Sequence, residues 1–431
     1  MSESPQPLFS RPFLAALMVI IPLLVLLLNL SAAKVAYPVP SITTWQTSSG
    51  ISVTWLTQDD WQSGQALELR LLFDQGYTHD STQHLTDSTF ALLLKDTLPL
   101  RTTDINQRFQ PLGAKASYRL DADSSELAIT LNSHPDLLAP SLALLTEWLP
   151  NPHFKERTFA KWQQSIRQDK DFTQQLLTSL YPQPPTDLAP NSQAIRLNDI
   201  QQHYQALSQQ LRAITIAGPL TDVEGFKQTL DRLTQSFSAS RQQADFAFTM
   251  NPALQTNEGD TLRDSYAAIA LAPVSTPAAW LSLQLWQKQF GAYLNADNNA
   301  NHLQLTLELT PQRQWLWWRI KHAPQILLSD QAQQTPQDHY YSRPLMTNFT
   351  LQAELFEPLF EKFTQQLAIA SHTPAWWADI ASQVTHGDTP ALQQWVNTYS
   401  DALNSFTLAT YKTHINALLQ PQSIQEVQIR Q

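Results

Sequence analysis

Phe13–Leu30 is a run of residues without a single charged side chain, and it constrains the fold more than any other feature of the sequence. As a helix this run would be about 27 Å long, close to the hydrocarbon thickness of a bilayer, which is about 30 Å. Pro22 interrupts the run, and membrane helices tolerate such a proline because neighbouring groups can satisfy the freed carbonyl. We therefore expect one transmembrane helix over residues 13–30, after a cytoplasmic tail of residues 1–12 and before a spacer of residues 31–40.

A cleaved signal peptide is the alternative interpretation of the same run, because Ser31, Ala32 and Ala33 follow it as a small-residue cleavage site. We favour an uncleaved anchor, since the apolar run is longer than the usual hydrophobic region of about 7 to 15 residues and little positive charge precedes it. Both interpretations place the rest of the chain outside the cytoplasm. For a bacterial chain we expect a single-pass inner-membrane protein with its bulk in the periplasm.

Composition excludes several classes of function. The chain has 27 Lys and Arg against 37 Asp and Glu, and a net charge of −10 repels phosphate backbones, so we expect no nucleic-acid partner. It contains no cysteine, which excludes disulfides, thiolate nucleophiles and thiolate metal sites. Only 9 glycines occur beside 28 prolines, which disfavours glycine-rich phosphate loops.

The order of predicted strands and helices is similar in two long stretches of the chain. Alternating apolar residues in Ile51–Leu56 and Ala66–Phe73 predict half-buried strands, and a helical pattern predicts one long helix over Phe154–Leu177. Ser265–Leu271 opens a second run of strands, which also leads into helices and closes on a strand. We therefore expect an α+β protein with an internal repeat. The expected parts are an N-terminal domain at 41–237, a linker at 238–250 and a C-terminal domain at 251–431.

Six segments carry a resemblance to one protein family. In chain order they are SSGISVTWL, LELRLLFDQGYTHD, LGAKASYRLDADSSELAITL, LLTEWLPNPHFKERTFAKWQ, LNDIQQHYQALSQQLRAITIAGPLTDVEGFKQTLDRL and TLATYKTHINALLQPQSIQEV. In these segments the sequence resembles the insulinase/pitrilysin family of zinc peptidases, in the two-domain form found in bacterial and mitochondrial processing proteins. The resemblance implies two tandem homologous α/β sandwich domains, each with an antiparallel-rich sheet and helices.

The resemblance also implies the place of a metal site, from which this sequence departs. Active family members hold zinc with an inverted His-x-x-Glu-His on the first long helix, where the Glu is the general base, and with a distal Glu from a later helix. A gap-free alignment puts Asp87, Phe90 and Ala91 at the His, Glu and second His positions. Phe90 cannot accept a proton, Ala91 has no ligand atom, and the distal stretch Trp162–Arg167 has no carboxylate. We therefore expect a catalytically degenerate member with no catalytic residue, no metal and no other cofactor.

A shifted register does not restore the site. His84, Asp87 and Ser88 would then stand at the ligand positions, and a serine hydroxyl is a poor zinc ligand beside imidazole. The separation of His79 and His84 does not match one helical turn, so their imidazoles would not align on a helix. We favour a solvated turn and a helix N-terminus for His79, Asp80 and Asp87, where aspartate is suited to capping.

Candidate peptide contacts come from the second half. In the family, an Arg and a Tyr of the second domain often hold the substrate backbone. The matching stretch here, GAYLNADNNANHLQLTLEL, has Tyr293 but no Arg. Tyr340 and Arg343 stand together further along and are the remaining candidates, and a loop near Pro344 is the plainer interpretation of that segment.

A set of tryptophans could either line a peptide groove or fill the core. These are Trp315, Trp317, Trp318, Trp376 and Trp377. Strand alternation places Trp315 and Trp317 on one face and Trp318 on the other, so at least one face of that strand is apolar and covered. We favour the core.

The leading functional hypothesis is a membrane-anchored, periplasmic pseudopeptidase that pairs with an active, zinc-bearing family member. Pairing of a subunit that holds the zinc motif with one that lacks it is known in the family, and the peptide chamber of the two-domain form needs two subunits face to face. The expected partners are this active subunit, a peptide substrate and the inner membrane through Phe13–Leu30. A non-enzymatic scaffold or binding module of a cell-envelope assembly is the alternative. An active hydrolase with an unrecognised site is a third hypothesis.

Overall fold

The computed structural model describes the chain from Tyr37 onward with several gaps. The described residues are 37–64, 66–77, 84–99, 103–165, 172–182, 195–240, 247–257, 259, 261–296, 300–322 and 340–431. Within them no helix is both long enough and apolar enough to cross a membrane. The predicted span Phe13–Leu30 lies outside the described residues and stays a prediction.

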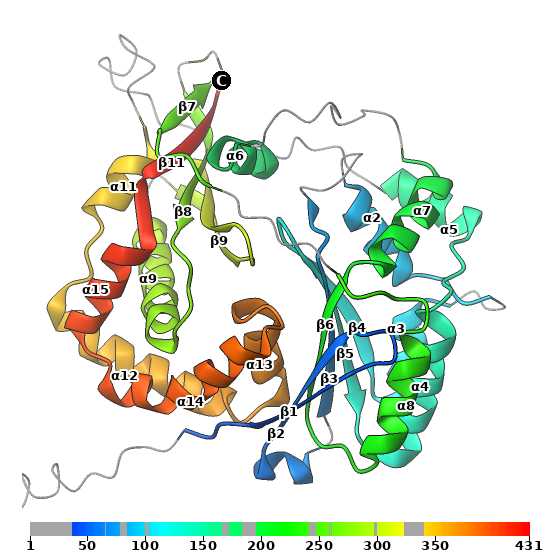
Figure 1. Ribbon diagram of the computed structural model, residues 1–431. Helices are drawn as coiled ribbons and strands as arrows, with labels where there is room; N and C mark the ends of the chain where they lie inside the picture. Colours follow the sequence, from blue (N-terminus) through cyan, green and yellow to red (C-terminus); the bar gives the residue numbers. More distant parts are fainter. Residues whose placement is uncertain are drawn as a thin grey trace, which may run out of the picture. The chain divides into compact units, whose positions relative to one another are not determined.

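A six-stranded sheet, here called sheet A, is built from the first half of the chain (Figure 1). Its strands are β1 Ser41–Gln46, β2 Ser52–Thr57, β3 Ala66–Phe73, β4 Lys115–Leu120, β5 Ser125–Asn132 and β6 Leu211–Ala217. Their spatial order is β1-β2-β6-β3-β5-β4, with β2 and β6 parallel and the other neighbours antiparallel. Leu67, Leu69 and Leu71 of β3 belong to the hydrophobic core, and the alternating Glu68 and Arg70 point to the other face. The strand predicted at 66–73 is therefore confirmed, but the expectation that it is half-buried is wrong, because other elements cover its second face as well.

A five-stranded sheet, here called sheet B, is built from the second half of the chain. Its strands are β7 Ala253–Thr256, β8 Leu262–Leu271, β9 Ala300–Leu309, β10 Gln314–His322 and β11 Leu419–Arg430. The order β7-β11-β8-β10-β9, with one parallel pair at β7 and β11, matches β2-β6-β3-β5-β4 of sheet A strand by strand. The predicted internal repeat is thus present in the strand topology. Sheet A lies within residues 41–237 and sheet B within 251–431, while the domain boundaries themselves stay a prediction.

Helices cover the sheets. Those of the first half are α2 Leu85–Leu93, α3 Ile105–Phe109, α4 Pro135–Trp148, α5 Glu156–Ser165, α6 Phe172–Leu180, α7 Leu197–Ser208 and α8 Val223–Leu233. Those of the second half are α9 Pro277–Asn295, α11 Ser342–Asn348, α12 Ala353–Ala370, α13 Pro374–Asp379, α14 Thr389–Ser405 and α15 Leu408–Leu418. In Figure 1, α4, α7 and α8 lie on one side of sheet A, and Trp148, Tyr204 and Phe226 from these helices complete its core. The predicted helix 154–177 corresponds to α5 and α6, and residues 166–171 between them lie outside the described part.

Each half of the chain contributes a helix to the other half's sheet. α6, Phe172–Leu180, packs against β8 and β11 of sheet B, where Leu176 and Leu180 join a core that includes Trp315. α13, Pro374–Asp379, packs against β2, β3 and β6 of sheet A. Because β8 and β11 hold the places in sheet B that β3 and β6 hold in sheet A, the exchange is reciprocal. α6 thus joins the hydrophobic core of the second half, whereas α13 covers the face of sheet A that carries Glu68 and Arg70.

The β4–β5 and β9–β10 turns hold equivalent places in the two sheets, and they contact each other. Nε of Arg313 lies 3.1 Å from Oδ1 of Asp123, and the side chains of this ion pair are only 3% and 1% exposed. Oγ1 of Thr310 donates a hydrogen bond to Oδ2 of Asp123 at 2.9 Å. Ala122 in the same turn is fully buried against a core that includes Trp315. A buried ion pair therefore ties the two halves together.

Glu308, near the end of β9, places a buried carboxyl group at the same contact. Its oxygens accept hydrogen bonds from the indole N–H groups of Trp315 and Trp317, at 3.0 and 3.1 Å, and from the backbone N–H of Ala122 at 3.3 Å. Burial is the main cause that raises the pKa of Glu308, to about 7, and the charge of Asp121 adds to it. The raised pKa shows that these donors do not fully replace the lost hydration of the carboxylate.

The tryptophans that strand alternation assigned to the core are buried. Trp315, Trp317, Trp318 and Trp377 are at most 8% exposed. The core interpretation is confirmed for these four side chains. Trp376 is half-buried and packs against Trp280 and Trp395.

The buried Glu308 predicts a pH-dependent stability. Its carboxyl group binds a proton more tightly in the folded chain than in the unfolded chain, where its pKa is 4.5. The resulting stabilisation is complete below that value and is lost as the pH rises through about 7, at a cost on the order of 2–4 kcal/mol. The Glu308→Gln variant has no carboxyl group at this position, so it does not lose stability through this deprotonation. We expect the stability of the variant, relative to the unaltered chain, to increase by that amount between about pH 5 and pH 8 in thermal unfolding.

Glu357→Gln on α12 is the matched control, because Glu357 is exposed. It should leave the pH profile of unfolding unchanged. Parallel profiles for Glu308→Gln and the unaltered chain would contradict the assignment of this pH dependence to Glu308.

Candidate functional site

Asp87 lies on α2, the helix that the sequence identifies with the family's metal helix. α2 begins after His84, which has a positive φ of 65° and is exposed. Asp87 is half-buried in the first turn, and its Oδ1 accepts a hydrogen bond from the hydroxyl of Tyr118 on β4 at 2.8 Å. Burial, followed by the charge of Asp87 and this hydrogen bond, raises the pKa of Tyr118, so the phenol keeps its proton and remains a donor. Asp87 therefore links α2 to the edge strand β4, and its Oδ1 is engaged by a phenol rather than open to a ligand.

Phe90 and Ala91 follow on the same helix. Phe90 is fully buried, and its ring stacks on that of Tyr118 with centroids 5.5 Å apart and planes 12° apart. The ring of Phe73 at the end of β3 lies 5.9 Å away on centroids. Ala91 is half-buried and ends in a methyl group. Phe90, which the sequence alignment sets at the general-base position, is thus part of the hydrophobic core.

The stretch that the sequence alignment sets at the distal ligand position, residues 162–167, begins on α5. Trp162 is half-buried, and its ring packs 5.7 Å from that of Phe159. Ile166 and Arg167, the end of the aligned stretch, lie outside the described residues. Across the part of the chain that is described, no three His, Cys, Asp or Glu side chains are grouped so that they could hold a metal ion.

Histidines close to α2 do not form a ligand pair. His79 and Asp80 lie outside the described residues. His203 on α7 places Nε2 2.9 Å from Oγ1 of Thr86 on α2, and burial lowers the pKa of this histidine to about 4. It is therefore neutral at ordinary pH and engaged with a hydroxyl. The exposed His84 caps α2 by position only, since its side chain makes no capping hydrogen bond.

The candidate peptide contacts lie in the second half. Tyr293 near the end of α9 is 40% exposed and packs against Phe349 with ring centroids 5.4 Å apart. Tyr340 and Arg343 are brought together, since the Arg343 guanidinium carbon lies 5.6 Å from the centre of the Tyr340 ring. Their segment is not a loop at Pro344, because α11 begins at Ser342; that part of the interpretation is wrong. A role of these residues in peptide contact stays a prediction.

A cluster of charged side chains lies on the face of sheet A that α13 covers. Arg70 on β3 contacts three carboxylates, those of Glu68 at 3.0 Å, Glu126 at 3.4 Å and Asp379 of α13 at 3.2 Å. Burial raises the pKa of Asp379 despite the attraction of Arg70. Because the carboxylates share one guanidinium, the cluster fastens α13 to sheet A.

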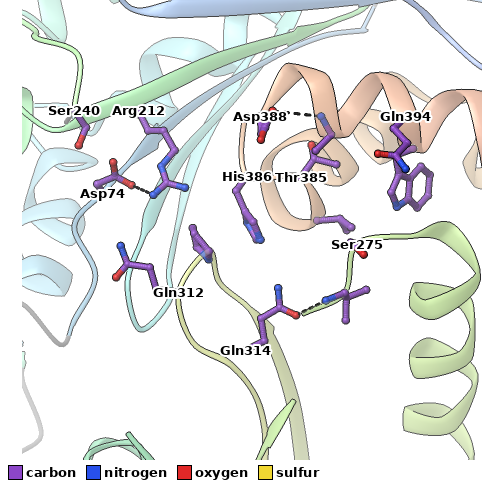
Figure 2. Close-up of a pocket in the computed structure, with 16 residues that line it drawn as sticks. Asp74, Arg212, Ser240, Ser275, Gln312, Gln314, Thr385, His386, Asp388 and Gln394 are labelled. Carbon is purple, nitrogen blue, oxygen red and sulfur yellow. Dashed lines mark hydrogen bonds and ion pairs between the residues drawn. The ribbon is translucent and has the colours of Figure 1, made fainter. Parts of the chain in front are cut away.

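The largest described pocket lies where strand ends of both halves meet, with a volume of about 950 Å³ (Figure 2). Asp74 follows β3, Arg212 stands in β6, Gln312 lies in the β9–β10 turn and Gln314 begins β10. The remaining wall comes from residues 384–388 before α14, residues 391, 394 and 395 on α14, residues 274 and 275 before α9, and residues 240 and 311. Sequence reasoning missed this pocket. Its one local signal is the His386-Gly387-Asp388 turn before a helix.

His386 is the central side chain of this pocket. Figure 2 shows its ring pointing into the space between the labelled residues. Burial is the first cause that lowers its pKa to about 3, and the charges of Arg212 and Arg119 lower it further, so the ring is neutral. Arg212 forms an ion pair with Asp74, and Asp388 accepts a hydrogen bond from the backbone N–H of Ala391 as the cap of α14.

Comparisons with known proteins show what the chain is similar to. No protein-family model matches the sequence, and no curated protein matches it. Solved structures do match. A protease from Helicobacter pylori has a TM-score of 0.67 at 11% identity, over 91% of this chain and 100% of that one. The inactive domain of an M16 peptidase from Pseudomonas fluorescens has a TM-score of 0.66 at 13% identity, over 90% and 98% of the two chains.

A third similar structure is longer than this chain. The periplasmic protease PqqL from Escherichia coli has a TM-score of 0.63 at 13% identity, and the match covers 93% of this chain but only 47% of PqqL. At these identities the likeness shows the fold. The fold expected from the insulinase-family resemblance is therefore confirmed.

Proposed function

We propose that this chain, which has the fold of the insulinase-family peptidases, is a non-catalytic subunit that pairs with an active zinc-bearing member to complete a peptide-processing chamber. The observation that carries the proposal is the filling of the metal helix. Phe90 stands where the general base belongs and is packed between Phe73 and Tyr118, and Asp87 is engaged by the Tyr118 hydroxyl. Such a subunit would form part of the chamber wall and contact the peptide, but it would not activate a water molecule.

Two comparisons support this proposal. One similar structure is itself described as an inactive domain, so the fold exists without activity elsewhere. The match to PqqL covers about half of that protease, which leaves room in PqqL for a second part of similar size. In the chamber that we propose, the active partner would supply the corresponding second part.

The membrane part of the proposal rests on the sequence. The uncharged run Phe13–Leu30 would anchor the chain in the bacterial inner membrane and place the two sheets in the periplasm. The short spacer to β1 at Ser41 would keep the chamber close to the membrane surface.

Copurification tests the proposed pairing. The full chain, tagged at its C-terminus, is extracted from its native membrane with detergent and captured. We expect one partner of similar length that bears an intact His-x-x-Glu-His, and we expect zinc in the complex but not in the isolated chain. The captured complex should cleave peptides, and a chelator should abolish that cleavage.

The isolated chain provides the control. Stoichiometric, tightly held zinc in it, with chelator-sensitive cleavage, would overturn the proposal in favour of an active hydrolase. Capture of cell-envelope proteins that all lack the zinc motif would favour the scaffold function instead.

A further inference from the structure

β1, the strand Ser41–Gln46, is an addition to sheet A that the repeat does not require. The order of sheet B, β7-β11-β8-β10-β9, matches five strands of sheet A, and β1 is the sixth. Within the described residues β1 pairs with β2 alone, so it forms one edge of sheet A (Figure 1). Four of its six residues are exposed, and the strand therefore adds little to the core. The fold of the repeat does not account for β1.

The backbone of β1 presents its outward groups in an order that can be derived. The N–H of Thr47 bonds the C=O of Ile51 at 3.0 Å, and the register of β1 and β2 continues from this pair without a bulge. Hydrogen-bonded and non-hydrogen-bonded pairs alternate along an antiparallel ladder. The backbone N–H and C=O groups of Ile42, Thr44 and Gln46 therefore point away from β2. No side chain or loop in the described part of the chain bonds them.

β1 lacks the features that usually protect a free edge. Edge strands commonly carry charges, prolines or bulges, which prevent pairing with another chain. β1 has the sequence SITTWQ and contains none of these. The opposite edge of sheet A is protected in contrast, because β4 carries Lys115 and Arg119. The Asn106 side chain also bonds the N–H and the C=O of Ala116 on β4, at 2.7 and 2.8 Å. This contrast marks β1 as a strand that is open to pairing.

A second copy of β1 fits this edge. Antiparallel pairing about a two-fold axis at Thr44 places Thr44 opposite its own equivalent and Ile42 opposite Gln46 of the second copy. All of the outward backbone groups then bond, since each such pair exchanges two hydrogen bonds. At the alternate positions Thr43 lies opposite Trp45, a β-branched and aromatic pair of the kind that stabilises sheets. No like charges meet, because β1 has no charged residue.

The place of β1 in the chain favours the same occupant. β1 follows directly on the spacer 31–40, and residues 13–30 are the proposed membrane anchor. In the paired register the two copies of Ser41 lie about 20 Å apart, at about 3.4 Å per residue. A ten-residue spacer reaches at most about 36 Å, so both anchors can enter one membrane. Confinement to one membrane raises the effective concentration of the copies, which favours pairing through a small interface.

We propose that β1 is a dimerisation strand, through which two copies of this chain join their A sheets into one continuous sheet. β1 and β4 are the two edges of sheet A, and α2 contacts β4. Pairing through β1 therefore leaves the edge beside α2 open for an active subunit. The dimer does not depend on that subunit.

Disulfide trapping of the full chain in its native membrane tests the proposal, because the chain has no cysteine of its own. In Thr44→Cys the two thiols face each other, with Cα atoms about 5.5 Å apart, which a disulfide can span. Gln46→Cys is the matched control, since Gln46 is also exposed but lies about 14 Å along the strands from its equivalent. After mild oxidation we expect at least about tenfold more cross-linked homodimer from Thr44→Cys than from Gln46→Cys.

Thr44→Lys gives a second measurement on the full chain in detergent. Two lysines directly opposite each other repel, so light scattering should find a dimer for the unaltered chain and a monomer for this variant. Thr256→Lys is its control, because Thr256 is an exposed threonine on β7, an edge strand of sheet B. It should leave the dimer intact, and unchanged thermal unfolding of the variants shows that they fold.

Several results would overturn the proposal. One is equal cross-linking of Thr44→Cys and Gln46→Cys, which would indicate random collision, and another is no cross-linking of either. Cross-links from Thr44→Cys to other proteins alone would show that the edge of β1 receives a different partner. Equal masses of Thr44→Lys and the unaltered chain would show that β1 does not hold two copies together.

Discussion

Phe90→Ala is expected to lower the free energy of unfolding by about 3–5 kcal/mol, a large fraction of the stability of a typical domain. The Phe90 side chain is fully buried between the rings of Phe73 and Tyr118, so its removal leaves a cavity under α2. The Tyr118 phenol would also lose its stacking partner next to Asp87. Urea unfolding of the full chain, followed by tryptophan fluorescence, measures the difference.

Leu355→Ala on α12 is the control for this measurement. Leu355 is an apolar side chain of similar kind but is 47% exposed, so its truncation should cost less than about 1 kcal/mol. A cost that small for Phe90→Ala would contradict the conclusion that this position belongs to the core.

Much of the fold was predictable because its signals are local. The alternation of Leu67, Leu69 and Leu71 with polar neighbours predicted β3. It did not predict that the face of Glu68 and Arg70 is also buried, because that face is covered by α13 from the second half of the chain. The repeated order of elements predicted two equivalent sheets. β1 was not among the predicted strands, because Ser41–Gln46 is short, largely exposed and rich in polar residues.

The helix exchange was not predictable from local pattern. Leu176 and Leu180 show that α6 has an apolar face, but nothing in their spacing says that this face covers sheet B. The choice depends on shapes that form only when both halves are folded. Similarly, we expected a single helix over 154–177. This range contains α5, which packs against α2, and α6, which packs against sheet B.

Some features of the candidate site could also be predicted from local sequence, and others could not. The expected replacement of the metal-site residues by Asp87, Phe90 and Ala91 comes from a sequence alignment of one helix and stays a prediction. The contact of Asp87 with Tyr118 could not, since it joins a helix to a strand that follows much later. The pocket around His386 is drawn from strand ends that are remote in sequence, and its residue types are common ones. Only the positive φ at His386, which the sequence does not reveal, sets that position apart.

Arg313→Met is expected to destabilise the chain by about 3–5 kcal/mol, because it leaves the carboxylate of Asp123 buried without its cation. The pair is already costly in the intact chain. Burial raises the pKa of Asp123 in spite of Arg313, and burial lowers the pKa of Arg313. The lost hydration of both charges thus outweighs their attraction. If this balance holds, Asp123→Leu combined with Arg313→Met should recover most of the stability that the single variant loses.

The exposed ion pair of Lys95 and Asp104 gives the matched control, with side chains 51% and 41% exposed and 3.4 Å between Nζ and Oδ2. Lys95→Met should cost no more than about 1 kcal/mol, since water and salt screen such a pair. The same urea unfolding measures all of these variants. A cost for Arg313→Met as small as that of Lys95→Met would contradict the conclusion that the variant leaves an uncompensated carboxylate buried at Asp123.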